Sequence, residues 1–134
     1  MIRQHHIPYR TEIDERDGEG TRYIVLLDDG YPVATCRFFD LGEVPADSVY
    51  AGYEGLVMLG RVVVLPKYRG RGLGAKTVIE AEKWIRELGY RYIGVDSRVT
   101  AVGFYEKLGY TVTGSEVYIS EPFKCIYVIK DLTK

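Results

Sequence analysis

The spacing of apolar side chains predicts strands in the first half of the chain. Two apolar runs, 22–28 and 31–38, flank Asp29–Gly30, and this dipeptide between such runs predicts a β-hairpin. Residues 56–65 form a further run rich in β-branched side chains, which predicts another strand. Gly60 within that run predicts a bulge or a close approach of another backbone.

A helical period follows this strand. Gly89 is placed to end the helix, and Glu82 and Arg86 have the spacing of an ion pair on its surface. Residues 90–95 then predict a strand parallel to 56–65, because a helix connects the two. The apolar face of the predicted helix carries Val78, Ala81, Ile85 and Leu88.

The helix–strand pattern repeats in shorter form toward the C-terminus. Ser97 or Thr100 is placed to cap a helix that runs to Leu108, and Gly109 ends it. Two further strands are predicted, at 110–113 and 123–130, with 117–119 extending one of them. The order of elements predicts an α+β fold with a mixed sheet.

Length, charge and cysteine content limit the kind of protein. We expect one domain over residues 1–134, with the charged segment 1–20 as a loop or arm. A net charge of −1 argues against general binding to nucleic acid or membranes. Cys36 and Cys125 fit neither a disulfide framework nor a metal site. Reduced thiols, no apolar run long enough to span a bilayer and no secretory signal predict a cytoplasmic protein without a metal.

A basic, glycine-rich segment lies between the strand 56–65 and the following helix. Glycines let backbone N–H groups approach a ligand closely, and a helix N-terminus carries unpaired donors and partial positive charge. The segment therefore predicts a site for a phosphate-bearing ligand, most simply a pyrophosphate. An ordinary turn before a helix also uses glycine, so this alternative stays open. Neither G-x-x-x-x-G-K-[ST] nor G-x-G-x-x-G occurs. The predicted site comprises Arg69, Gly70, Arg71, Gly72, Leu73 and Gly74.

This segment resembles a known coenzyme loop. Arg69, Gly72 and Gly74 form Arg-x-x-Gly-x-Gly, which resembles the acetyl-CoA loop of the GNAT superfamily of N-acetyltransferases. The Val-x-Val-x-Pro-x-Tyr-Arg-Gly lead-in and Phe-Tyr-Glu-Lys-Leu-Gly-Tyr at 104–110 also resemble that family. The resemblance runs from about residue 23 to the C-terminus and is strongest to the small ElaA-like branch. It implies the GNAT fold, N-terminally shortened by the first strand and most of the first helix.

The resemblance also implies a binding mode for acetyl-CoA. The pantetheine arm would lie between strands 56–65 and 90–95, and its amides would pair with the main chain of Val62, Val63 and Val64. The pyrophosphate would bind N–H groups of the glycine-rich segment. Tyr105 holds the position of the family's usual general acid, where it would protonate the departing thiolate or only bind the sulfur. The alternative for Tyr105 is a core aromatic residue without a catalytic role.

The base and the acceptor are not identified by the sequence. The strand 56–65 contains no carboxylate, and a water chain is an alternative to any side chain. Arg98 is placed to reach a phosphate, an acceptor carboxylate or only water, and Cys125 is expected to be a buried strand residue. The carboxylates nearest by layout are Glu54, Glu116 and Glu121, whereas His5 and His6 are expected to lie in the arm.

Two functional hypotheses result. The first is an acetyl-CoA-dependent N-acetyltransferase that acts on a primary amine of a small molecule or peptide through a ternary complex. The second is a CoA-binding or subunit-interaction module with little or no turnover. The shortened edge and the many aromatic residues suggest a homodimer.

Overall fold

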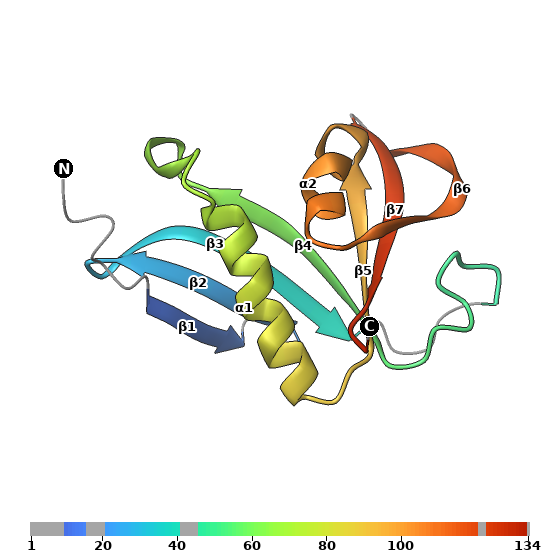
Figure 1. Cartoon of the computed structure of the whole chain (residues 1–134), viewed down its shortest axis with the longest axis horizontal. Coiled ribbons are helices and arrows are strands. Elements are labelled where there is room, and N and C mark those ends of the chain that lie inside the picture. The colour runs from blue at the N-terminus through green and yellow to red at the C-terminus, as the bar shows by residue number, and fades with distance from the viewer. Residues whose placement is uncertain (1–9, 16–20, 41–45, 121–122, 134) are drawn as a thin grey trace.

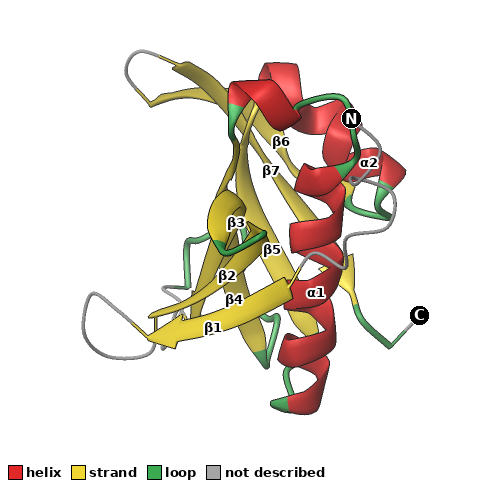
Figure 2. Cartoon of the chain, turned by 90° about the vertical axis from the view of Figure 1, so that its left-hand side faces the viewer, coloured by secondary structure: helices red, strands yellow, loops and turns green. Residues whose placement is uncertain are grey.

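The computed structural model describes residues 10–15, 21–40, 46–120 and 123–133. These residues form one seven-stranded sheet, and both α-helices lie on the same face of it (Figures 1 and 2). The strands are β1 (Arg10–Glu15), β2 (Thr21–Asp28), β3 (Tyr31–Asp40), β4 (Leu56–Val64), β5 (Tyr92–Arg98), β6 (Thr111–Ser120) and β7 (Phe123–Asp131). The helices are α1 (Leu73–Glu87) and α2 (Val102–Lys107), each preceded by a short 3₁₀ turn, η2 (Pro66–Tyr68) and η3 (Val99–Ala101).

The strand order in the sheet is β1-β2-β3-β4-β5-β7-β6. Only β4 and β5 are parallel among the described pairs, and the connection between them is α1. This confirms the predicted mixed sheet and the predicted parallel pair. The predicted hairpin is also confirmed, because Asp29 and Gly30 both have positive φ, 55° and 87°, as the tight turn between β2 and β3 requires.

The N-terminal region differs from the prediction of a loop or arm over residues 1–20. Residues 10–15 form β1, which pairs antiparallel with β2 from Arg10↔Leu27 to Glu15↔Arg22. The polar composition of this segment favoured a loop, but β2 offers a full edge of backbone hydrogen-bonding groups, and pairing with it outweighs local propensity. Residues 1–9, with His5 and His6, and residues 16–20 lie outside the described residues.

The start of α2 differs from the prediction, whereas the ends of both helices agree with it. Ser97 and Thr100 do not cap α2: Ser97 is a strand residue whose Oγ donates to the carbonyl of Arg98, 2.8 Å away, and α2 begins without a side-chain cap. The predicted helix stops are confirmed, since Gly89 and Gly109 have φ of 92° and 96°.

The main core lies between the sheet and the helices. Val78, Ala81 and Ile85 of α1 are fully buried there, as predicted, but Leu88 is 40% exposed because it follows the end of the helix. The opposite face of the sheet has a second, aromatic-rich cluster around Tyr50, which belongs to the loop between β3 and β4.

The pairing of β4 with β5 is short. Only Leu56–Met58 pair with Tyr92–Gly94, and beyond this point the two strands diverge (Figure 1). A bulge interrupts β4 immediately afterwards, at the place that Gly60 predicted: Arg61 has a φ of 52°, and the register with β3 shifts there. Beyond Met58, the side of β4 that faces β5 therefore has no strand paired with it.

A tyrosine occupies the other face of the sheet where the two strands separate. The hydroxyl of Tyr50 donates to the carbonyls of Val95 and Val128, at 3.2 and 3.3 Å. A Cβ on Gly94 would lie 2.9 Å from two ring carbons of Tyr50 and 3.0 Å from the sulfur of Met58. Only glycine at this position lets the ring pack against the sheet.

We predict that Gly94→Ala lowers the free energy of unfolding by about 1–3 kcal/mol, because the new methyl group forces the Tyr50 ring or β5 to move. Urea denaturation measures the change. Gly103→Ala is the matched control: a Cβ there meets nothing within 4 Å, and alanine is favoured over glycine in a helix by about 1 kcal/mol. Equal stability of the two variants would show that the Tyr50 contact does not constrain β5.

Candidate functional site

A groove of about 430 Å³ opens where β4 and β5 diverge. It brings together residues from three separate parts of the chain: the second half of β4, the loop before α1 with the first turn of α1, and η3 with the start of α2. Six of the ten site residues that the sequence predicted line it, whereas Gly70, Arg71, Gly72 and Leu73 do not and lie in the chain between Arg69 and Gly74. The lining residues are Val62, Val63, Val64, Arg69, Gly74, Ala101, Phe104 and Tyr105.

The backbone groups of the three valines in β4 do not all face the groove. The N–H of Leu65 donates to the carbonyl of Val33, 2.9 Å away, and Thr35 lies opposite Val63. Because backbone groups alternate in direction along an antiparallel ladder, those of Val63 face β3 and those of Val64 face away from it. The Val64 carbonyl accepts a hydrogen bond from Nε of Arg69 at 3.1 Å. Its N–H remains directed away from β3, toward the groove.

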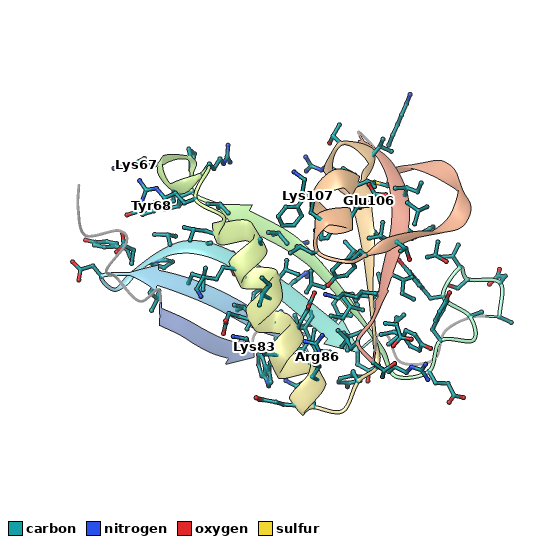
Figure 3. All side chains as sticks on the ribbon, viewed as in Figure 1. Lys67, Tyr68, Lys83, Arg86, Glu106 and Lys107 are labelled. Atoms are coloured by element: carbon teal, nitrogen blue, oxygen red, sulfur yellow. The ribbon has the colours of Figure 1, made fainter. Side chains whose placement is uncertain are left out.

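The glycine-rich segment forms a tight turn into α1. Gly70 and Gly72 have φ of 82° and 76°, and a Cβ on either would meet nothing within 4 Å. These glycines are therefore required by backbone conformation and not by lack of space. Arg71 places its guanidinium 4.9 Å from the ring centroid of Tyr68, and Figure 3 shows Tyr68 and Lys67 at this end of α1.

The N-terminus of α1 presents unpaired donors. The helix has neither a capping side chain nor an acidic residue in its first turn, and the first bond back to the turn runs from the N–H of Lys76 to the carbonyl of Gly72. Within the described chain, no N–H between residues 70 and 75 has an acceptor. The side chain of Leu73 is 3% exposed and packs in the core, so only its N–H faces solvent or a ligand. Such a turn is suited to an anion.

Gly74 keeps the groove open between its two walls. A Cβ at this position would lie 3.5 Å from Cε1 of Phe104 and 3.5 Å from Cγ1 of Val62, which is ordinary contact distance. Glycine thus leaves a gap between α1 and α2 that a larger side chain would fill.

Tyr105 ends the groove at α2. Its ring lies edge-on to those of Phe104 and Tyr110, with centroids 5.0 and 5.6 Å away, and the residue is 6% exposed. Its hydroxyl has no hydrogen-bond partner among the described residues. Burial, and in second place the neighbouring Cys36, raise its pKa to about 12, so the hydroxyl is protonated at neutral pH. The site thus offers a neutral hydrogen-bond donor at one end and a cluster of N–H groups at the other.

Other candidates from the sequence lie apart from the groove. Glu54 lines a different pocket, at the opposite end of β4, where the hydroxyl of Tyr90 donates to Asp40 at 2.7 Å. Arg98 is exposed at the end of β5, and Cys125 is 6% exposed on β7, opposite Arg98. The backbone of Glu116 belongs to β6, whereas Glu121 lies outside the described residues.

Sequence reasoning did not select Asp96, although the fold places it near the point of divergence. Asp96 is an exposed residue of β5, two positions beyond Gly94, the last residue paired with β4. It follows Val95, whose side chain is in the core beneath the helices, so it faces the other side of the sheet. Strand β4 contains no carboxylate, and Asp96 is the carboxylate of β5.

The described residues hold no group of three His, Cys, Asp or Glu side chains that could bind a metal ion. Within the same residues, neither α-helix has the length and apolar character needed to cross a membrane.

Comparisons with known proteins agree with this geometry. An uncharacterized acetyltransferase in the arcA 3′ region of Streptococcus pyogenes is 32% identical over 123 residues, which are 92% of this chain and 76% of that protein. The crystal structure of a putative N-acetyltransferase from Lactobacillus plantarum superposes with a TM-score of 0.69 at 29% identity, covering 89% of this chain and 74% of that one.

A further solved structure shares the fold at lower identity. The PaiA N-acetyltransferase from Thermoplasma acidophilum, solved in complex with coenzyme A, is 16% identical, with a TM-score of 0.64 over 84% of this chain and 61% of that one. The sequence model of the Acetyltransferase (GNAT) family matches residues 2–110. The fold predicted from the sequence is confirmed, and this chain is a member of the GNAT family of acetyltransferases.

Proposed function

We propose that this acetyltransferase moves the acetyl group of acetyl-CoA directly to a primary amine of a small molecule or peptide, within a ternary complex. The observation that carries the proposal is one groove lined by Arg69 and Gly74, which flank the turn with unpaired N–H groups, and by Tyr105. Acetyl-CoA has a diphosphate at one end of a long arm and a thioester at the other, and the groove has matching chemistry at its two ends.

The diphosphate is assigned to the turn from Arg69 to Gly74. Unpaired N–H groups, the positive end of the α1 dipole and the exposed Arg71 all favour negative charge there. Arg69 already donates to Val64 through Nε, and this bond holds its guanidinium beside the groove. The PaiA N-acetyltransferase, which shares the fold, was solved in complex with coenzyme A, and this is consistent with a coenzyme A ligand here.

The arm is assigned to the open edge of β4. The N–H of Val64 is directed toward the groove, and Val62 and Val63 line it, whereas the main chain of Val63 is engaged with β3. We therefore assign the hydrogen bonds with the pantetheine amides to the main chains of Val62 and Val64, and contact with the arm through its side chain to Val63.

Tyr105 is assigned to the leaving sulfur. Its pKa of about 12 makes full proton transfer to a thiolate unfavourable, because the conjugate thiol has a pKa of roughly 8.5. Donation of a hydrogen bond to the sulfur as the carbon–sulfur bond breaks requires no such transfer. Between the two roles that the sequence left open, the raised pKa supports the hydrogen bond.

Asp96 is assigned to binding of the acceptor amine. A free primary amine has a pKa near 10 and arrives as an ammonium ion, which a carboxylate attracts and orients, and its proton leaves to solvent before the neutral amine attacks. The side chain of Asp96 lies across the sheet from Tyr105, so amine and leaving group would approach the thioester from different sides. The ElaA-like branch and the homodimer stay predictions.

Calorimetry with acetyl-CoA, followed by an assay of CoA release with a broad set of amines, tests the proposal as a whole. Binding of acetyl-CoA and acetylation of an amine are the expected results. Binding without any acetylated product would favour the alternative of a CoA-binding or subunit-interaction module. Absence of binding would overturn both.

We predict that Gly72→Ala weakens acetyl-CoA binding about tenfold or more, because a residue with a Cβ disfavours the φ of 76° that aims the N–H groups at the diphosphate. Gly30→Ala is the matched control, since Gly30 has a φ of 87° in the distant β2–β3 turn and equally open surroundings. Both variants should lose similar stability, and only the first should lose affinity in calorimetry. Equal affinities would remove the diphosphate from this turn.

For Tyr105→Phe we expect kcat to fall about 10- to 100-fold while the Kd of acetyl-CoA changes little. Because the pKa of the Tyr105 hydroxyl is about 12, it remains protonated up to about pH 10, and the ratio of wild-type to variant kcat should be constant from pH 7 to 10. Tyr31→Phe, at a tyrosine that is 74% exposed, is the control. A variant with unchanged kcat across this range would show that Tyr105 only fills the core.

Asp96→Asn should lower kcat/KM for the amine about tenfold or more and leave acetyl-CoA affinity unchanged, because the acceptor and not acetyl-CoA would meet this carboxylate. Steady-state kinetics at fixed, saturating acetyl-CoA measure the effect. Glu54→Gln changes a carboxylate in the other pocket and should behave as wild type. If Asp96→Asn and Glu54→Gln have the same kinetics, the acceptor is received elsewhere.

A further inference from the structure

A charged cluster is buried behind the groove, where α1, the end of α2 and β7 meet. Glu82 is 3% exposed, and both of its carboxylate oxygens are occupied. Lys130 donates to Oε1 at 2.9 Å, and the hydroxyl of Tyr110 donates to Oε2 at 2.8 Å. Lys130 also donates to the carbonyl of Leu108 at 2.7 Å, which is the residue that ends α2.

Glu82 differs from its predicted place on the surface of the helix. Its spacing from Arg86 is that of a surface ion pair, but α1 turns Glu82 inward, and Figure 3 shows Arg86 near the far end of the helix. The surface pair of the helix is instead Lys83 with Glu80, at 3.0 Å. Glu82 therefore makes tertiary contacts and no surface ion pair.

The cluster reaches Tyr105 through Tyr110. The N–H of Tyr110 donates to the carbonyl of Tyr105 at 3.1 Å, and the two rings meet edge to face with centroids 5.6 Å apart. Lys130 approaches so closely that a Cβ on Gly109 would lie 3.3 Å from its Cε. The backbone that carries Tyr105 is thus tied to the cluster at both Leu108 and Tyr110.

Burying such a cluster needs a physical reason. An ion pair away from water gains little stability over apolar side chains of similar size, because desolvation of both charges offsets their attraction. The hydrogen bonds of the cluster are directional, so they fix the relative positions of the groups that they join. A helix of six residues such as α2 is too short to hold its own orientation, and Lys130 and Tyr110 fix its end relative to α1.

We propose that Glu82, Lys130 and Tyr110 are positioning residues that hold α2 so that the hydroxyl of Tyr105 meets the sulfur of acetyl-CoA. The proposal rests on the function proposed for Tyr105. These three side chains touch neither substrate: they act through the Tyr105 backbone and ring. A displacement of about 1 Å in a donor of this kind is enough to cost a large part of its catalytic effect.

A double-mutant cycle tests the proposal in the full-length enzyme. Tyr110→Phe keeps the ring contact with Tyr105 and removes only the bond to Glu82, and Glu82→Gln keeps the shape and removes the charge. In the wild-type background each should lower kcat about tenfold, with the Kd of acetyl-CoA unchanged. In the Tyr105→Phe background each should change kcat less than about twofold, because the group that they position is gone.

Glu80→Gln, at the exposed pair on the same helix, is the control and should leave kcat unchanged in both backgrounds. Equal losses for Tyr110→Phe and Glu82→Gln in both backgrounds would show a merely structural cluster and overturn the proposal. If Tyr105→Phe alone leaves kcat unchanged, the role of Tyr105 itself is wrong, and the positioning role is overturned with it.

A crystal structure of Tyr110→Phe gives a readout independent of activity. We expect the Tyr105 ring to shift or to adopt a second conformer while β4 and the turn before α1 stay in place. An unchanged Tyr105 would overturn the positioning role even if no acceptor amine has been found. Should Tyr110→Phe fail to fold, the same measurement on Glu82→Gln decides.

Discussion

The short pairing of β4 with β5 is the constraint on which the rest of the structure depends. Three residue pairs hold the two parallel strands together, and then β4 bulges at Arg61 and turns away. A complete ladder would have satisfied the β4 backbone with β5. The divergence instead leaves one edge of a central strand for a ligand, so the groove is made from backbone that would otherwise be in the sheet.

Three local features maintain this opening. Gly94 lets the Tyr50 ring pack at the last paired residues, and the Tyr50 hydroxyl satisfies carbonyls of β5 and β7 there. Gly74 leaves free the space beside Phe104 and Val62 that a larger side chain would fill. The Glu82 cluster holds the end of α2. Each acts at a different wall, and together they explain how a chain of this size keeps a preformed groove.

Sequence reasoning found the parts of the fold and the site that depend on local chemistry. The Asp29–Gly30 turn, the apolar face of α1 and the glycines that end both helices follow from backbone preferences and side-chain periodicity. Residues of the groove were predicted because a glycine-rich turn before a helix has a direct physical meaning, and the observed geometry brings Arg69, Gly74 and Tyr105 to one place.

The errors concern contacts between segments that are distant in sequence. The pairing of β1 with β2 could not be read from a polar hexapeptide, and the burial of Glu82 depends on Lys130, 48 residues later. The main chain of Val63 faces β3 only because the bulge sets the register. The sequence did not point to Asp96, because the role proposed for it depends on where β4 leaves β5 and not on any motif.

The seam between β4 and β5 also divides the molecule into two lobes, one built on β1–β4 and the other on β5–β7. Only three residue pairs join β4 to β5 there, and the halves are also joined by the main core, by Tyr50 and by the Glu82–Lys130 pair. A molecule seated in the opening would touch both lobes and replace part of the missing ladder. Binding of a ligand in the groove therefore stabilises the protein against unfolding. In the protein without a ligand, the contacts between β4 and β5 are expected to open first.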